Sequence, residues 1–165
     1  MTKKNWLKFS LYTSAAAILL LICVSPIILP FQREDARQIS CASNLISLGA
    51  AMRQYAMAHH DYFPDKNGIA GLDILRREKY CSDAKVYLCP SSGLSPAKAG
   101  QPFISSYEYQ GGLKATSENA SQPLMWDKPG NHRYVSNVLF CDGHVEAITI
   151  KNGKEISRKI FRRSP

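Results

Sequence analysis

The sequence predicts an α+β fold in which one long N-terminal helix packs on a small antiparallel β-sheet. The first observation is a stretch without charged residues between Lys8 and Arg33. The second is an apolar stripe at steps of four, three, four and three residues, formed by Cys41, Leu45, Leu48, Met52 and Tyr55. The third is a series of short β-type runs in the C-terminal half, of which the last two are joined by Asp-Gly at 142–143.

The net charge of +8 over 165 residues lies at the two ends of the chain. Three lysines precede residue 9, and the basic tail 151–165 carries an excess of five positive charges, so the part between them is neutral. A neutral folded part produces no general field that attracts polyanions. We therefore expect no nucleic-acid partner, and we expect the tail to be frayed.

The uncharged stretch predicts a transmembrane anchor over residues 9–30. A bilayer core requires about 20 apolar helical residues, at about 1.5 Å each. Lysines in the preceding residues 1–8 place the N-terminus in the cytoplasm, so a single-pass protein of the inner membrane with domain 31–150 in the periplasm is expected. The alternative is a cleaved signal peptide, which Pro26 disfavours because it would directly follow the cleavage junction.

The elements beyond the anchor follow from local patterns. The amphipathic helix that begins near Arg33 should end near 59–61, because Phe63-Pro64 cannot extend it. A short helix is expected at 71–80, and the run 86–89 reads as a strand that Pro90 halts. A Ser/Gly/Pro-rich loop should follow. The remaining β candidates are 105–109, 124–127, 135–140 and 144–150.

Four cysteines follow the predicted anchor, namely Cys41, Cys81, Cys89 and Cys141. An even number on an oxidising side of a membrane favours one or two disulfides, with three possible pairings. The alternative is four unpaired buried thiols.

Several segments together resemble a known family. They are DARQISCASNL at 35–45, DYFP at 61–64, VYLCPS at 86–91, WDKPGNH at 126–132 and NVLFCDGHV at 137–145. They resemble, in order, the motifs of pilin-like proteins common in planctomycete and verrucomicrobial genomes, which are related to the type II secretion major pseudopilin. The C-terminal signature of these proteins is a histidine, nine residues and then Asp-Gly, and His132, Asp142 and Gly143 match that spacing.

The resemblance implies a pilin-like fold whose long helix is a membrane stem in its first half and amphipathic in its second. It also implies pilin or pseudopilin subunits as partners through the N-terminal helix, besides membrane lipid. The family-like contexts of Cys41 and Cys89 make them the first choice for a disulfide, with Cys81 and Cys141 second. The front of the chain departs from the family pattern, because no glycine precedes the apolar run and residues 1–33 contain no glutamate.

A metal site is a further hypothesis. His132, Asp142 and His144, with Asp127, would form a ligand set for zinc or calcium if the hairpin gathers them on one side. Asp142 and His144 are two residues apart and would share a face of a strand. The alternative is a structural role, because Asp-Gly is also what a tight turn requires.

The function that these observations predict is structural rather than enzymatic. We expect a membrane-anchored, pseudopilin-like subunit or accessory of a type II secretion or type IV pilus-like assembly. The alternative is a solitary anchored periplasmic binding module that does not polymerise. A third hypothesis is a metal-dependent envelope enzyme, but no nucleophile, base and orienting group occur at a recognisable spacing.

Overall fold

A computed structural model describes the backbone of residues 3–150 and the side chains of 12–24 and 32–150. The predicted basic tail lies outside the described residues. The chain divides into two units, Met1–Ala36 and Arg37–Pro165. Helix α1 is assigned to Lys3–Ala58, and its residues from Arg37 belong to the second unit.

The predicted transmembrane anchor is wrong, because no helix in the described part of the chain combines the length and apolarity that crossing a membrane requires. A bilayer core requires about 20 apolar residues. Among the described side chains of the first unit, the strongly apolar run is confined to 18–24 and is preceded by Tyr12, Thr13, Ser14 and three alanines. The predicted inner-membrane location is wrong for the same reason, because it depended on this anchor. That prediction had placed the N-terminus in the cytoplasm and the domain in the periplasm.

In the second unit, α1 buries the predicted apolar stripe. Cys41, Leu45, Leu48 and Met52 are fully buried, and Tyr55 is half-buried. Burial of this stripe stabilises this part of the helix, because most helical stability in proteins comes from the packing of an amphipathic face. The helix ends at Ala58, and the chain then turns through His60 and Asp61 with positive φ.

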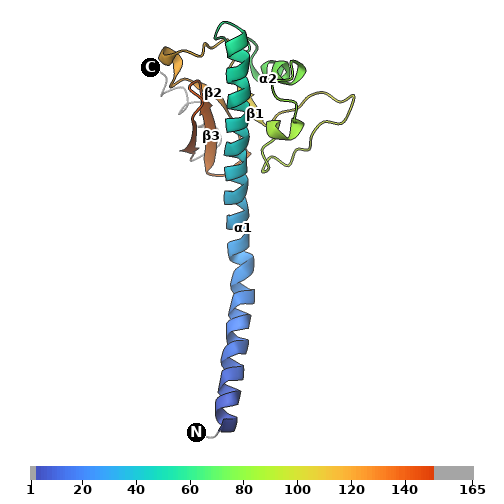
Figure 1. The fold of residues 1–165 in the computed structure, drawn as a ribbon. Coiled ribbons are helices and arrows are strands. Elements are labelled where there is room, and N and C mark those ends of the chain that lie inside the picture. Colours follow the sequence, from blue (N-terminus) through green and yellow to red (C-terminus); the bar gives the residue numbers. More distant parts are fainter. Residues whose placement is uncertain (1–2, 151–165) are drawn as a thin grey trace. The chain divides into compact units, whose positions relative to one another are not determined.

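The sheet has four antiparallel strands in the order β1-β2-β3-β4. They are β1 Tyr107–Tyr109, β2 Pro123–Asp127, β3 Val135–Phe140 and β4 Val145–Thr149, which confirms the four β candidates of the C-terminal half. The turn between β3 and β4 has Gly143 at φ +91°, a conformation that favours glycine. Figure 1 shows β1, β2 and β3 beside the part of α1 that belongs to the second unit.

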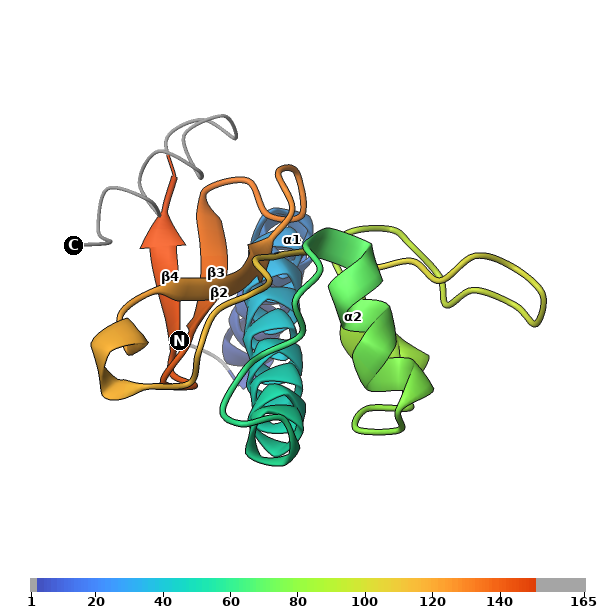
Figure 2. The same cartoon turned by 90° about the horizontal axis from the view of Figure 1, so that it is seen from above.

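Three short helices accompany the sheet. They are α2 Gly68–Arg77 and the 3₁₀ helices η1 Ala84–Tyr87 and η2 Ser117–Asn119. The predicted strand at 86–89 is wrong, because its first half forms the end of η1, whose first turn is capped by Asp83 accepting from the Lys85 N–H at 2.9 Å. Seen from above, α2 lies on one side of α1 and strands β2 to β4 lie on the other (Figure 2).

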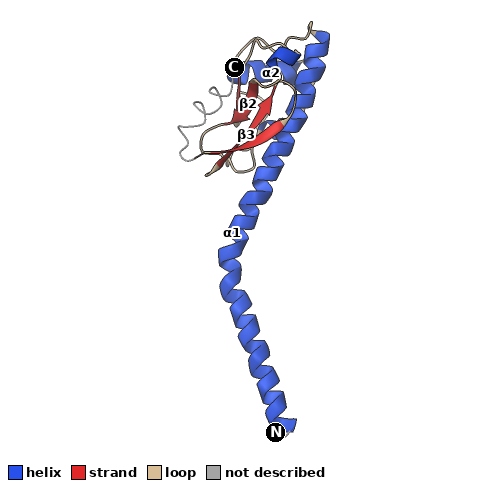
Figure 3. Ribbon diagram, turned by 90° about the vertical axis from the view of Figure 1, so that its left-hand side faces the viewer, coloured by secondary structure: helices blue, strands red, loops and turns tan. Residues whose placement is uncertain are grey.

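The pleat of the sheet separates two apolar clusters. Met125 and Leu139 belong to the core that contains the buried stripe of α1, whereas Trp126 and Val138 belong to a second cluster. The helix and the sheet pack closely enough that a Cβ on Gly49 of α1 would lie 2.9 Å from Leu139 Cδ1. Figure 3 shows β2 and β3 next to this end of α1.

The predicted pilin-like fold class is therefore corrected. The unit that contains the sheet begins at Arg37 and consists of the four antiparallel strands, three short helices and only the 37–58 part of α1. The membrane stem that defined the predicted class is not found in the described residues, because their apolar run is too short.

Candidate metal centre

Four metal-ligating side chains meet in the second unit. They are Cys41 on α1, Cys89 just after η1, Asp127 at the end of β2 and His132 in the loop before β3. One ligand atom of each residue lies within 4.8 Å of those of the other three. All four residues are buried, the most exposed being His132 at 6%. This group is called the four-ligand cluster below.

The contacts inside the cluster are short. Cys41 Sγ donates to Asp127 Oδ1 at 2.8 Å, and Cys89 Sγ lies 3.2 Å from His132 Nε2. His132 Nε2 also lies 3.8 Å from Asp127 Oδ2. The four groups thus face a common centre from four separate segments of the chain.

Asp127 is fixed by donors from the neighbouring strand. Its Oδ2 accepts from the backbone N–H of Asn137 at 2.7 Å and from Asn137 Nδ2 at 3.1 Å. Asn131 Nδ2 lies 3.5 Å from Oδ1 and donates to Ser106 O at 2.7 Å. A buried carboxylate needs such donors, since burial without them is costly.

The two cysteines are supported in a similar way. Tyr107 Oη lies 3.3 Å from Cys41 Sγ, and the Cys89 backbone N–H donates to Ser106 Oγ. Asn44, three residues after Cys41 on α1, donates from Nδ2 to Leu88 O at 2.9 Å. The helix and the Cys89 segment are therefore joined by polar contacts as well as by apolar packing.

The surroundings shift the pKa values of the two thiols in opposite directions. Hydrogen bonding with Cys41, then with His132, lowers the pKa of Cys89 to about 6 although burial acts to raise it. Hydrogen bonding to Cys89, burial and the negative charge of Asp127 all raise the pKa of Cys41. This lowering of its pKa favours the thiolate form of Cys89, which is the form that binds metals.

The geometry fits a tetrahedral metal ion. With Zn–S bonds of about 2.3 Å and Zn–N or Zn–O bonds of about 2.0–2.1 Å, neighbouring ligand atoms lie roughly 3.3–3.8 Å apart. Three of the separations in the cluster are 2.8, 3.2 and 3.8 Å, and none exceeds 4.8 Å. Ligand shifts of less than about 1 Å would complete the site.

The predicted site residues are divided between two places. His132 belongs to the cluster, and so does Asp127, which the sequence offered as a companion ligand. Asp142 and His144 instead form an exposed pair at the β3–β4 turn, with His144 Nδ1 2.5 Å from Asp142 Oδ1. The predicted three-residue ligand set is therefore not brought together.

All five cysteines are free thiols in the structure. The first predicted disulfide pair, Cys41 and Cys89, is brought together within the cluster. For the second predicted pair, Cys141 is buried and Cys81 half-buried. Burial raises the pKa of Cys141 to about 12, so this thiol is inert near neutral pH.

Sequence reasoning did not place the two cysteines beside Asp127 and His132, and it missed the contacts of Asn137 and Tyr107. A signal was present, because each ligand lies in or beside one of the family-like segments quoted above. To bring these segments together in a prediction, one would need the register of β2 and β3. In that register Trp126 pairs with Val138, so Asn137 lies opposite Asp127.

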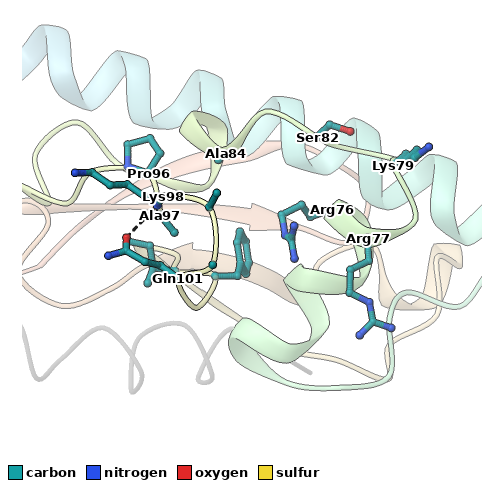
Figure 4. A pocket seen from close by; sticks show the side chains of 13 residues that line it. Arg76, Arg77, Lys79, Ser82, Ala84, Pro96, Ala97, Lys98 and Gln101 are labelled. Carbon is teal, nitrogen blue, oxygen red and sulfur yellow. Dashed lines mark hydrogen bonds between the residues drawn. The ribbon is translucent and has the colours of Figure 1, made fainter.

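A separate cavity of about 490 Å³ lies between the end of α2 and the 96–104 loop. Its lining contains no His, Cys, Asp or Glu. Arg76 is paired with Asp73 at 2.6 Å, and the side chains of Arg77, Lys79 and Lys98 point away from one another (Figure 4). The cavity therefore lacks the converging groups that a catalytic site requires.

Comparison with known proteins adds no assignment, since no family model, curated protein or solved structure matches this chain.

Proposed function

We propose that the second unit is a non-catalytic structural domain held together by one zinc ion in the four-ligand cluster. The observation that carries the proposal is the convergence of four buried ligand atoms within 4.8 Å of one another. Four protein ligands fill a tetrahedral coordination sphere, which is typical of structural zinc, whereas catalytic zinc keeps a position open for water or substrate.

The donor chemistry selects the metal. Two thiolates and one imidazole suit zinc, because soft and borderline ligands favour it over hard cations. Calcium, the other metal considered from the sequence, takes six to eight oxygen ligands. The cluster offers one carboxylate, so calcium does not fit.

The zinc would act as a cross-link. Cys41 and Asp127 are 86 residues apart in the chain, and Cys89 and His132 are 43 apart. One ion would thus tie α1 to the segment after η1, to the end of β2 and to the following loop. Because an unfolded chain has no preformed site, the binding free energy stabilises the fold directly.

The first test is the metal content of the purified full-length chain. We expect about one zinc per chain by elemental analysis, as a single four-ligand site requires. We expect loss of this zinc in Cys89→Ser and retention in the matched control Cys141→Ser, whose thiol is buried outside the cluster. Zinc at about 100 times its Kd should raise the free energy of unfolding by about 2.7 kcal/mol.

Two results would contradict the proposal. One is a wild-type chain that contains no zinc and whose urea unfolding curve does not shift on adding it. The other is equal loss of zinc in Cys89→Ser and Cys141→Ser, which would point to binding outside the cluster.

A second proposal concerns the setting in which this domain acts. We propose that the chain is a subunit or accessory of a type II secretion or type IV pilus-like assembly. Two observations support it: the family-like segments supply the cluster ligands, and α1 exposes apolar side chains at 18–22, which a partner helix could cover. A solitary binding module is the alternative.

Photo-crosslinking distinguishes the two settings. A crosslinker in place of Leu20, which is 68% exposed, should join two copies of the chain or join it to a pilin-type subunit. The same crosslinker in place of the exposed Ser43 in the second unit serves as the control. A chain that stays monomeric with the crosslinker at Leu20 would favour the solitary module.

A further inference from the structure

We infer that Asn137 is a positioning residue that makes Asp127 a one-oxygen metal ligand and thereby sets the geometry of the site. This inference rests on the zinc site proposed above. Asn137 is not itself one of the four ligand residues.

Asn137 presents two donors to a single carboxylate oxygen. Its backbone N–H reaches Asp127 Oδ2 at 2.7 Å and its side-chain Nδ2 reaches the same atom at 3.1 Å. Asn137 and Asp127 are both 1% exposed, so water does not compete for these contacts. Asn137 lies on β3, one residue before Val138, which pairs with Trp126 of β2. The strand register therefore places both donors.

The consequence is a difference between the two oxygens of Asp127. A carboxylate oxygen has two lone-pair directions, and the two Asn137 donors use both of those on Oδ2. Oδ1 instead faces Cys41 Sγ at 2.8 Å, whereas Oδ2 lies 3.8 Å from His132 Nε2. When the Cys41 proton leaves on metal binding, Oδ1 is the oxygen that can bind the ion.

One-oxygen binding matters for the choice of metal geometry. With Oδ1 alone, the ligands number four and the site is tetrahedral, as zinc prefers. If Asp127 could turn and offer both oxygens, the site would become five-coordinate and less specific for a small tetrahedral ion. Asn137 thus favours the tetrahedral arrangement by occupying both lone-pair directions of Oδ2.

The test uses the full-length chain loaded with Co²⁺, whose visible d–d absorption is strong in tetrahedral sites and weaker at higher coordination. Asn137→Ala removes the side-chain donor and leaves the backbone donor. The matched control is Ser136→Ala, the preceding residue on β3, which is 1% exposed and whose Oγ has no hydrogen-bond partner. Zinc affinity is measured by competition with a chelating dye.

We expect weaker d–d absorption in Asn137→Ala and a zinc affinity lower by about 10- to 100-fold, as for other residues that orient metal ligands. Ser136→Ala should match the wild type in both measurements. If Asn137→Ala fails to fold, Asn137→Leu preserves the side-chain volume, and the same results are expected of it.

The possible failures are distinct. A wild-type chain without thiolate-to-cobalt charge-transfer bands would overturn the zinc proposal and this inference together. A wild-type chain with a tetrahedral spectrum that Asn137→Ala or Asn137→Leu leaves unchanged, with unchanged zinc affinity, would overturn the role of Asn137 alone.

Discussion

At the scale of single residues, Asp142 and His144 have the side chains of metal ligands but instead stabilise a turn. Asp142 Oδ1 accepts from the His144 backbone N–H at 3.0 Å and lies 2.5 Å from the His144 ring nitrogen. The His144 ring stacks on Phe140, with ring centroids 4.4 Å apart. The pair therefore closes the β3–β4 hairpin, the structural role that Asp-Gly often has.

This pair makes a prediction about pH. Burial acts to raise the pKa of Asp142, but hydrogen bonds from His144 and the nearby positive charges outweigh it and lower the pKa. A lowered folded-state pKa stabilises the protein above the unfolded value of about 3.9, and this contribution is lost as the pH falls below it. Asp142→Asn should therefore reduce stability at pH 7 by less than about 1 kcal/mol, since the pair is exposed.

Urea unfolding of the wild type and of Asp142→Asn at pH 7 and at pH 3 checks this. The difference between the two proteins should shrink at the lower pH, because a larger share of the wild-type carboxylate is then protonated. A difference that is the same at both values would mean that the charge of Asp142 contributes nothing.

At the scale of elements, the packing of α2 depends on the absence of a side chain at Gly71, which lies close to Lys66 and Tyr109. A Cβ on Gly71 would lie 2.1 Å from Lys66 O and 2.5 Å from Tyr109 Cε1. Gly71→Ala should therefore lower the free energy of unfolding by about 1–3 kcal/mol through overpacking. This is the opposite sign from the gain of about 1 kcal/mol that alanine gives in an unconstrained helix.

Chemical denaturation measures this effect, and Ile69→Ala in the same helix is the control because Ile69 is 40% exposed. The control should change stability by within about 0.5 kcal/mol. Stabilisation by Gly71→Ala would show that α2 can move away from β1.

The elements also show what local sequence can predict. The strands β3 and β4 were predictable because an alternating pattern and an Asp-Gly turn are adjacent in the chain. The strand expected at 86–89 failed because Asp83 caps a 3₁₀ turn that residue-by-residue β preference does not reveal. The membrane stem failed because an absence of charge is not the same as a continuous apolar run.

At the scale of the whole molecule, the site was the least predictable part. His132 lies before and Asp142 after the six-residue strand β3, whose length is roughly 20 Å at about 3.3 Å per residue. Their regular spacing in sequence therefore reflects the strand between them rather than shared ligation. Cys41 and Cys89 were expected to meet, and they do lie in one cluster. Asp127 and His132 lie beside these cysteines because of the register of the sheet. That register cannot be predicted from any single segment of the sequence.

The wide separation of the four ligands along the chain has a kinetic consequence. Contacts between residues 86 positions apart form slowly, because the entropy of closing a long loop must first be overcome. All four residues of the cluster are buried, so an ion bound there could leave only when the surrounding segments separate. Exchange of the ion with the solvent would then follow the slow opening of the domain rather than local fluctuations of one loop, and a bound ion would report how long each molecule has stayed folded.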